Sequence, residues 1–187
     1  MRLFIATTFP EAVLRALNER LTTVKSKLPP ASWVRPETQH LTYAFLGEQD
    51  ESVVERIAPK IEEQLKPTAK FEASLHHSGF FPNRRHPRVG WCGVEPEEQF
   101  KTIASAVREG VRAGGVAFEE NEFRPHLTLM RIRDHWPPLA IETFEKALGN
   151  YQSAPFAVDH VTLFVSRLSP KGATHTPLRQ FALGLPS

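Results

Sequence analysis

The sequence predicts an α+β protein made of two related halves, and three observations lead to this prediction. The tripeptide His-Leu-Thr occurs at residues 40–42 and again at 126–128, so that the two histidines are 86 positions apart. At the same spacing, "RLFIATTFPE" from Arg2 aligns with "RVGWCGVEPE" from Arg88 without a gap. Each half also begins with an apolar run, a proline and a segment of helical period. We therefore predict one bilobal domain, 1–187, with repeat halves of approximately 1–87 and 88–187.

The first half is expected to open with a strand over residues 3–9. A helix should follow from Pro10, because the missing N–H of a proline leaves no hydrogen bond unmade at a helix start. Apolar residues then recur with the 3.6-residue period of a helix that buries one face, at Val13, Leu14, Leu17, Leu21 and Val24. The first His-Leu-Thr segment predicts the next strand, and a second helix is expected over about residues 51–65, before further extended runs.

The second half should repeat this order. A strand is expected over residues 89–94, and a helix from Pro96 that buries Phe100, Ile103, Ala104, Val107 and Val111. The second His-Leu-Thr segment then predicts a strand, residues 139–148 a helix, and "THTPLRQFALGL" a closing strand with alternating polar and apolar positions. No low-complexity linker separates the halves, so the two lobes should pack as one unit.

Composition excludes several classes of protein. At 187 residues, with 41% hydrophobic and 24% charged residues of mixed sign, the chain can bury a core and does not resemble a disordered tail. A net charge of +2 is too small to predict non-specific binding to nucleic acid. No apolar stretch is long enough for a membrane helix, and a single cysteine, Cys92, excludes an internal disulfide. We expect a cytoplasmic monomer.

The paired His-x-Thr segments predict a site for an oxyanion. Alternation along a strand puts His40 and Thr42 on one face and Leu41 on the other, and the same holds for His126 and Thr128. If the halves pack about an approximate twofold axis, two imidazoles and two hydroxyls surround one volume. The imidazoles can serve as general acid and general base, and the hydroxyls can hold phosphate oxygens. Phosphoryl transfer is favoured over acyl transfer, because no recognisable Ser or Cys nucleophile motif occurs.

Only the second half places an arginine beyond its His-x-Thr segment. Arg131 in "HLTLMR" aligns with Phe45 in "HLTYAF". Strict alternation would turn Arg131 to the face opposite His126, unless a bulge or the strand end reorients it. With that condition, Arg131 is a candidate for charge-assisted binding of phosphate.

The remaining histidines are expected to be structural or solvated. A third His-x-Thr match, at His160, lies in a segment that is not equivalent to the other two and is interpreted as part of a sheet surface. His76 and His77 should point to opposite faces of one strand and are interpreted as structural. Three others lie in loop-like or edge positions and are expected in solvent, namely His86, His135 and His175.

Two further interpretations concern cations. Metal binding is not expected at the paired segments, because threonine is a poor ligand, neither segment carries a carboxylate and no H-E-x-x-H pattern occurs. The loop "PNRRHPR", with Arg84, Arg85 and Arg88, is either a solvated turn or a contact for a polynucleotide backbone.

Five segments together resemble a known family. They are "RLFIATTFP", "VRPETQHLTYAFLGE", "GFFPNRRHPRVGWCGV", "EFRPHLTLMRI" and "SRLSPKGATHTPLRQFAL". In this order, and over nearly the whole chain, they are similar to the LigT-like RNA 2′,3′-cyclic phosphodiesterases, also called RNA 2′-5′ ligases, of the two-histidine (2H) phosphoesterase superfamily. The resemblance implies a bilobal α+β fold with antiparallel sheets lining a central cleft. It also implies hydrolysis of RNA 2′,3′-cyclic phosphate ends to a 2′-phosphate without metal, ATP or other cofactor, and in some members reversible 2′-5′ joining.

The same resemblance implies roles for the site residues. His40 would be the proton donor to the departing 3′ oxygen, and His126 the base that activates water. Thr42 and Thr128 would hold phosphate oxygens, and Arg131 would take the place of the phosphate-binding arginine. One departure is His175, which stands before "TPL" where the family commonly has tyrosine.

Two alternatives stay open on the sequence. One is a binding module that holds a nucleotide or an RNA end without turning it over. The other is a phosphodiesterase that acts on a small cyclic nucleotide. The expected partners are therefore RNA with 2′,3′-cyclic phosphate ends or small cyclic nucleotides.

Overall fold

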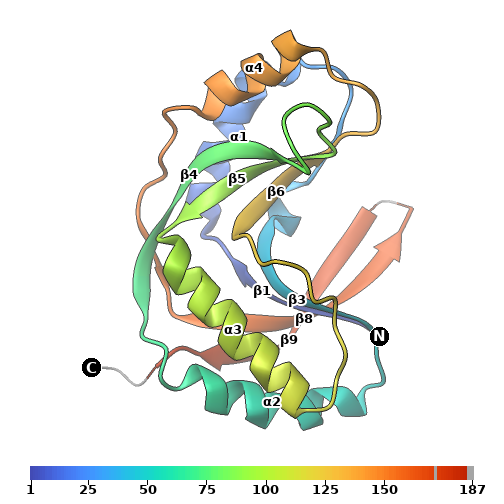
Figure 1. Ribbon diagram of the computed structural model, residues 1–187, viewed down its shortest axis with the longest axis vertical. Coiled ribbons are helices and arrows are strands. Elements are labelled where there is room, and N and C mark those ends of the chain that lie inside the picture. Colours follow the sequence, from blue (N-terminus) through green and yellow to red (C-terminus); the bar gives the residue numbers. More distant parts are fainter. Residues whose placement is uncertain (171, 185–187) are drawn as a thin grey trace.

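The structure is a computed structural model and describes residues 1–170 and 172–184. It contains two antiparallel sheets, which occupy the lower and upper halves of Figure 1. The four-stranded sheet has the order β3 (His40–Glu48), β1 (Arg2–Thr8), β8 (His160–Ser169) and β9 (Gly172–Ala182). The five-stranded sheet has the order β2 (Ser32–Trp33), β6 (His126–Arg131), β5 (Val89–Glu95), β4 (Phe71–Phe81) and β7 (Phe156–Val158). The predicted α+β class with antiparallel sheets is confirmed.

Four α-helices and one short 3-10 helix, η1 (Pro36–Thr38), complete the described fold. They are α1 (Glu11–Lys25), α2 (Ser52–Leu65), α3 (Glu97–Ala113) and α4 (Pro138–Leu148), and all four occur where the sequence predicts them. α2 and α3 pack against each other and contact β9 and β3 respectively, whereas α1 contacts α4, which in turn contacts β4 (Figure 1). Each sheet is thus accompanied by a pair of helices.

Each sheet takes strands from both parts of the chain. The four-stranded sheet combines β1 and β3 with β8 and β9, and the five-stranded sheet combines β2 and β4 with β5, β6 and β7. The helix pairs follow the same rule, because α2 packs with α3 and α1 with α4. The two layers are therefore interleaved in sequence, and neither can be completed by one half of the chain alone.

Most of the apolar side chains pack into one cluster between these helices and sheets. The periodic residues of α1 and α3 that the sequence assigns to the core are buried, among them Leu17, Leu21 and Phe100, except Val24 near the end of α1, which is half-buried. Gly110 allows α3 to approach α2 closely, because a Cβ at this position would lie 2.7 Å from the Cα of Ile61. Among residues 1–170 and 172–184, no helix combines the length and the hydropathy that crossing a membrane requires.

Candidate active site

His40 and His126 occupy equivalent local settings, each as the first residue of its strand. Nδ1 of His40 lies 2.7 Å from the carbonyl oxygen of Thr38, and Nδ1 of His126 lies 2.6 Å from that of Arg124. Because a carbonyl oxygen only accepts, each Nδ1 carries the hydrogen. In the neutral ring Nε2 is then the proton acceptor, which is the form that a general base requires.

Both strands contain a β-bulge directly after the threonine. In β3, Thr42 pairs with Ala6 and Ala44 pairs with Ile5, which leaves Tyr43 as an extra residue. In β6, Thr128 pairs with Trp91 and Met130 pairs with Gly90, which leaves Leu129 as the extra residue, and the two strands share one pattern of buried and exposed positions over these six residues. A bulge shifts the alternation of side chains by one position. The residue five positions after each histidine therefore returns to the face of that histidine.

Polar groups from elsewhere in the chain hold both bulges. The carbonyl oxygen of Tyr43 accepts a hydrogen bond of 3.0 Å from Nε of Arg108 on α3, and that of Leu129 accepts one of 2.9 Å from the backbone N–H of Val34. These partners satisfy carbonyl groups that the bulges remove from the regular ladder.

Arg131 was expected to bind phosphate only if a bulge or the strand end turned it to the face of His126. The bulge at Leu129 fulfils this condition. The charge of Arg131 contributes to lowering the pKa of His126, so the guanidinium and the imidazole are close enough to interact. In the first strand the equivalent residue is Phe45, whose ring centroid lies 6.1 Å from that of Phe4, while Phe4 lies 4.8 Å from His40. The two ends of the site are therefore alike in backbone and different in charge.

The two histidines belong to one electrostatic environment. β3 and β6 contact each other, although they belong to different sheets. Burial lowers the pKa of His40 to about 4 against the effect of its hydrogen bond to Thr38, and the charges of His175 and His126 lower it further. Burial also lowers the pKa of His126, against its hydrogen bond to Arg124. Both imidazoles are consequently neutral at pH 7 when the site holds no anion.

Aromatic rings surround each imidazole. Phe81 stacks on Trp91 at a centroid distance of 5.3 Å and meets the ring of His126 edge-on at 4.8 Å. On the other sheet, Phe4 contacts His40 and stacks on Phe164 at 5.2 Å. These contacts fix the ring orientations and provide the burial that lowers both pKa values.

His175 was expected in solvent, and this prediction is wrong. Its ring lies 5.1 Å from His40 and 4.9 Å from Phe4, because β9 pairs with β8 and places His175 opposite Ser166. Burial, followed by the charge of Arg35, lowers the pKa of His175. The one sequence feature that pointed to a role for His175 was its alignment with a position where the family commonly has tyrosine. The spacing of His175 along the chain gave no such indication.

The prediction that His76 and His77 point to opposite faces is also wrong. A bulge in β4 leaves His77 unpaired with a φ of +60°, and the two ring centroids lie only 3.6 Å apart. By contrast, His86 and His135 are exposed as predicted, and His160 pairs with its neighbour Asp159.

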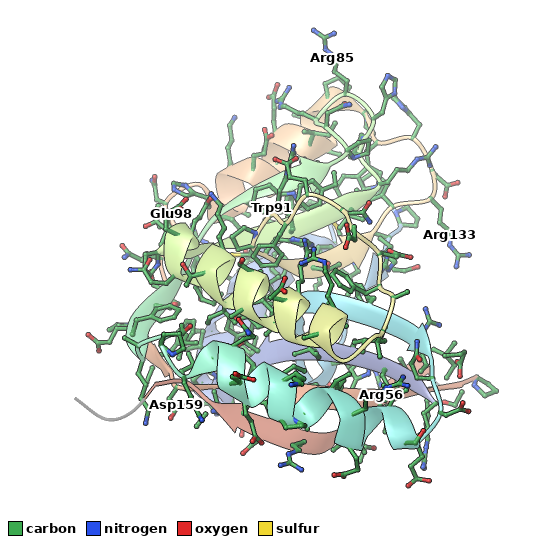
Figure 2. All side chains as sticks on the ribbon, turned by 60° about the horizontal axis from the view of Figure 1, so that its bottom comes forward. Arg56, Arg85, Trp91, Glu98, Arg133 and Asp159 are labelled. Atoms are coloured by element: carbon green, nitrogen blue, oxygen red, sulfur yellow. The ribbon has the colours of Figure 1, made fainter. Side chains whose placement is uncertain are left out.

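The basic loop is partly engaged in contacts within the protein. Arg84 forms an ion pair of 3.0 Å with Glu145, and Nη1 of Arg88 donates to the carbonyl oxygen of Arg133. Arg85 extends outward at the tip of the loop, and Arg133 also projects from the surface (Figure 2).

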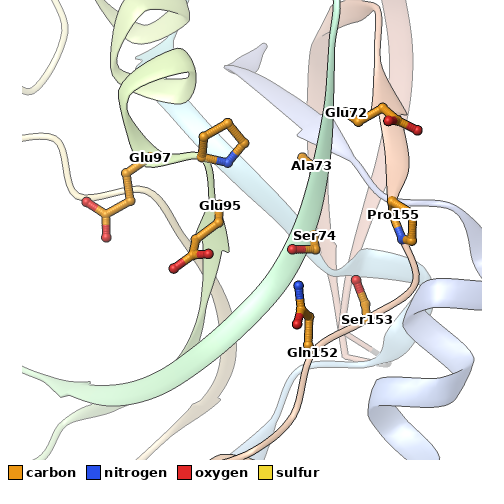
Figure 3. A pocket seen from close by; sticks show the side chains of 9 residues that line it. Glu72, Ala73, Ser74, Glu95, Glu97, Gln152, Ser153 and Pro155 are labelled. Atoms are coloured by element: carbon orange, nitrogen blue, oxygen red, sulfur yellow. The ribbon is translucent and has the colours of Figure 1, made fainter.

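Two cavities lie outside the paired histidines. One, of about 640 Å³, lies at the start of α3, where Glu72, Ser74, Glu95 and Glu97 are among its lining residues (Figure 3). The other, of about 670 Å³, runs beside α1 and η1. Neither is lined by His40 or His126, so the site is defined by its chemical groups rather than by either cavity.

Known proteins resemble this chain along nearly its whole length. RNA 2′,3′-cyclic phosphodiesterase of Thermotoga maritima is 31% identical over 189 residues, covering 99% of this chain and 98% of that protein. The protein of the same name from Thermus thermophilus is 33% identical over 191 residues, covering 98% and 90%. The crystal structure of TT0787 from Thermus thermophilus superposes with a TM-score of 0.75 at 30% identity, covering 98% of both chains.

A further solved structure shares the fold at lower identity. LigT of E. coli, crystallised with 3′-AMP, has a TM-score of 0.71 at 24% identity and covers 97% of each chain. The family model of the 2′-5′ RNA ligase superfamily matches residues 10–169. The match covers both His-x-Thr strands, all of the five-stranded sheet, and β3 and β8 of the four-stranded sheet. This chain therefore belongs to the 2′-5′ RNA ligase superfamily.

Proposed function

We propose that this protein is an RNA 2′,3′-cyclic phosphodiesterase that opens the cyclic phosphate to a 2′-phosphate, with 2′-5′ ligation as the reverse of the same chemistry. The observation that carries the proposal is the pair of equivalent strand starts, each with a histidine whose Nδ1–H is bound to a backbone carbonyl. Relatives that align with nearly the whole chain bear this name.

The proposed reaction needs two proton transfers and no further reactant besides water. Nε2 of His126 takes a proton from water as the water oxygen forms a bond to phosphorus. The bond between phosphorus and the 3′ oxygen breaks, and protonated Nε2 of His40 donates its proton to that oxygen. Thr42 and Thr128, half-buried on the same faces as the histidines, would donate hydrogen bonds to the non-bridging oxygens, and Arg131 would bind their negative charge.

The assignment of His40 as the acid and of His126 as the base follows the family that the chain resembles. The charge of Arg131 helps to keep His126 neutral, as a base must be. In the empty site burial lowers the pKa of His40 to about 4, so the bound anionic phosphate would have to raise this pKa before His40 could donate its proton.

An RNA end fits the surroundings of the site better than a mononucleotide alone. Arg131 pairs with Val89, next to Arg88, and Arg88 in turn donates to the carbonyl oxygen of Arg133. These arginines could contact further phosphates of a chain. We propose that kcat/KM is higher for an oligonucleotide with a cyclic phosphate end than for the mononucleotide. Equal values would favour a small cyclic nucleotide as the substrate.

The decisive test uses the purified protein and cytidine 2′,3′-cyclic phosphate, with chromatographic separation of 2′-CMP from 3′-CMP. We expect 2′-CMP as the product, at a rate that EDTA leaves unchanged. Formation of 3′-CMP would contradict the proposed leaving group. Binding of the nucleotide without any product would support the binding-module alternative instead.

Variants of the two histidines test the mechanism directly. We expect His40→Ala and His126→Ala each to lower kcat by roughly 10²- to 10⁴-fold, the usual contribution of one general acid or base. His135→Ala, which removes an exposed imidazole, is the matched control and should retain full activity. Circular dichroism would establish that the variants are folded, and full activity in either site variant would refute the mechanism.

The proposal extends to the assembly and location of the protein. Both histidines come from one chain, so we propose a monomer that acts in the cytoplasm, where the buried thiol of Cys92 stays reduced. Light scattering on the active protein would test the monomer, and fractionation of cells that express it would test the location.

A further inference from the structure

We propose that His76, His77 and Glu95 bind a divalent transition-metal ion, with Zn²⁺ as the favoured ion, at a site separate from the paired His-x-Thr residues. These three residues offer one ligand atom each, and the three atoms lie within 4.8 Å of one another. Two imidazoles and one carboxylate form a donor set that suits zinc, whose catalytic sites often have three protein ligands and a water.

The backbone of β4 is shaped so that both histidines can reach one point. His76 pairs with Gly93 and Ser78 pairs with Cys92, so His77 is the extra residue of a bulge. Its φ of +60° is one that residues other than glycine rarely adopt. Regular alternation would turn its side chain away from His76. With the bulge, both rings contact the same carboxylate.

The distances to that carboxylate match the edges of a zinc tetrahedron. Oε1 of Glu95 lies 3.4 Å from Nδ1 of His76 and 3.2 Å from Nε2 of His77. Bonds of about 2.0–2.1 Å from zinc to nitrogen or oxygen imply a separation of about 3.4 Å between tetrahedral ligands. Small rotations of the two imidazoles would therefore complete the three-ligand arrangement.

One feature distinguishes this cluster from an ordinary ion pair. Nδ1 of His76 is shielded from solvent, and although it lies 3.4 Å from Oε1 of Glu95, it makes no hydrogen bond to any residue in the described part of the chain. Buried polar nitrogens normally make a hydrogen bond, and one that does not calls for an explanation such as a bound ion. A metal ion would take up the lone pair of this nitrogen.

The surroundings of the cluster are acidic. Glu95 lines the cavity of about 640 Å³ together with Glu72 and Glu97 (Figure 3). Lys101 offsets part of this charge, since it lies 3.5 Å from Glu97. A cation beside Glu95 would be attracted by the remaining carboxylates.

The proposed metal site lies near the candidate active site and is not part of it. Gly93 pairs with His76 on one side and with His126 on the other. The backbones of His76 and His126 are thus two strand spacings apart, or about 10 Å. Because the paired histidines could themselves bind zinc, an experiment must separate the two sites.

Isothermal titration of the full-length protein with Zn²⁺ provides the test. We expect one tight site in the wild type. His77→Ala and Glu95→Gln should each weaken it by on the order of 100-fold or more, because loss of a direct ligand costs at least as much as loss of its supporting partner. The side chain of His77 is 61% exposed, so its replacement should leave the core intact. His135→Ala and His126→Ala should retain the affinity of the wild type.

The proposal is overturned if the wild type binds no Zn²⁺, or if affinity is lost in His126→Ala and kept in His77→Ala. Titration with Co²⁺ gives an independent signal, because a tetrahedral cobalt site absorbs in the visible range. This absorption should disappear in Glu95→Gln, a variant that leaves the backbone bulge unchanged. Both readouts are independent of phosphodiesterase activity, so failure of this proposal and failure of the proposed function can be told apart.

Discussion

Arg131 lies on the same face of β6 as His126, although it is five positions further along the strand. The bulge at Leu129 produces this arrangement, and the bulge at Tyr43 does the same for Phe45 and His40. The same kind of bulge thus occurs in both strands, but the side chain that it brings to the face of the histidine is charged in β6 and aromatic in β3. This difference makes Arg131 the most informative position for separating binding from proton transfer.

Replacement of Arg131 by leucine should lower kcat/KM by about 10- to 100-fold, the effect of losing a hydrogen bond to a charged group. Since the charge of Arg131 helps to depress the pKa of His126, its removal should also raise that pKa, as an NMR titration of the imidazole would show. Phe45→Leu is the matched control, and it should leave the pKa of His126 in place. An unchanged pKa of His126 in Arg131→Leu would contradict the proposed contact.

The two threonine hydroxyls should matter for turnover more than for stability. Thr42→Val and Thr128→Val keep the shape of each side chain and remove one donor, so we expect each to lower kcat/KM by about 10-fold. Serine at either position should restore most of the activity. Thr143→Val, which removes an exposed hydroxyl that bonds to the carbonyl of Leu139 on α4, serves as the control. Equal rates for all three valine variants would exclude a role for the site hydroxyls.

The depressed pKa of His40 should make stability depend on pH. Its pKa is about 4 in the folded protein and near 6.5 when unfolded, so the unfolded chain binds more protons between these values. The contribution of His40 is fully present above pH 6.5 and is lost as the pH falls towards 4. From pH 7.5 to pH 5, His40 alone should lower the free energy of unfolding by about 2 kcal/mol. Urea unfolding at several pH values gives the free energy of unfolding as a function of pH. This free energy should fall more steeply from pH 7.5 to pH 5 in the wild type than in His40→Asn, and an identical pH dependence would rule out the buried neutral imidazole.

His175 should act as a positioning residue for His40. Phenylalanine at this position keeps an aromatic ring against His40 and Phe4 but removes a charge that lowers the pKa of His40. An NMR titration of His175→Phe should therefore show a higher pKa for His40 than in the wild type. His175→Tyr should preserve activity, because members of the family commonly have tyrosine at this position. A pKa of His40 that does not move in His175→Phe would assign His175 to packing alone.

The regular elements of this protein were predictable from local patterns. The periodic apolar residues of α1 and α3 and the prolines before them predict these helices because they depend only on neighbouring residues. The pairing of His40 with Thr42 and of His126 with Thr128 on shared faces followed in the same way from alternation. The duplication of the chain stays a prediction, which the common pattern of burial in β3 and β6 supports.

The features that escaped prediction depend on partners far away in the sequence. Whether a strand contains a bulge is decided by the register of its neighbour, so the positions of Arg131 and His77 could not be read from alternation. His175 reaches His40 only because β9 lies beside β8, and β8 beside β1. No spacing within "THTPLRQF" reveals that order of strands.

The interleaving of the two sheets has a consequence for synthesis on the ribosome. β1 can pair with β3 soon after both emerge, but its other edge is covered only by β8, whose partner residues Thr162 to Ser166 are made near the end of the chain. From the end of β3 at Glu48 to Ser166 the ribosome adds 118 residues, which takes roughly 6 to 24 s at usual rates of translation. For that time the nascent protein presents an open strand edge of the kind that invites association with other chains. Molecular chaperones that shield such edges are therefore expected to raise the yield of this protein more than that of one whose neighbouring strands are consecutive.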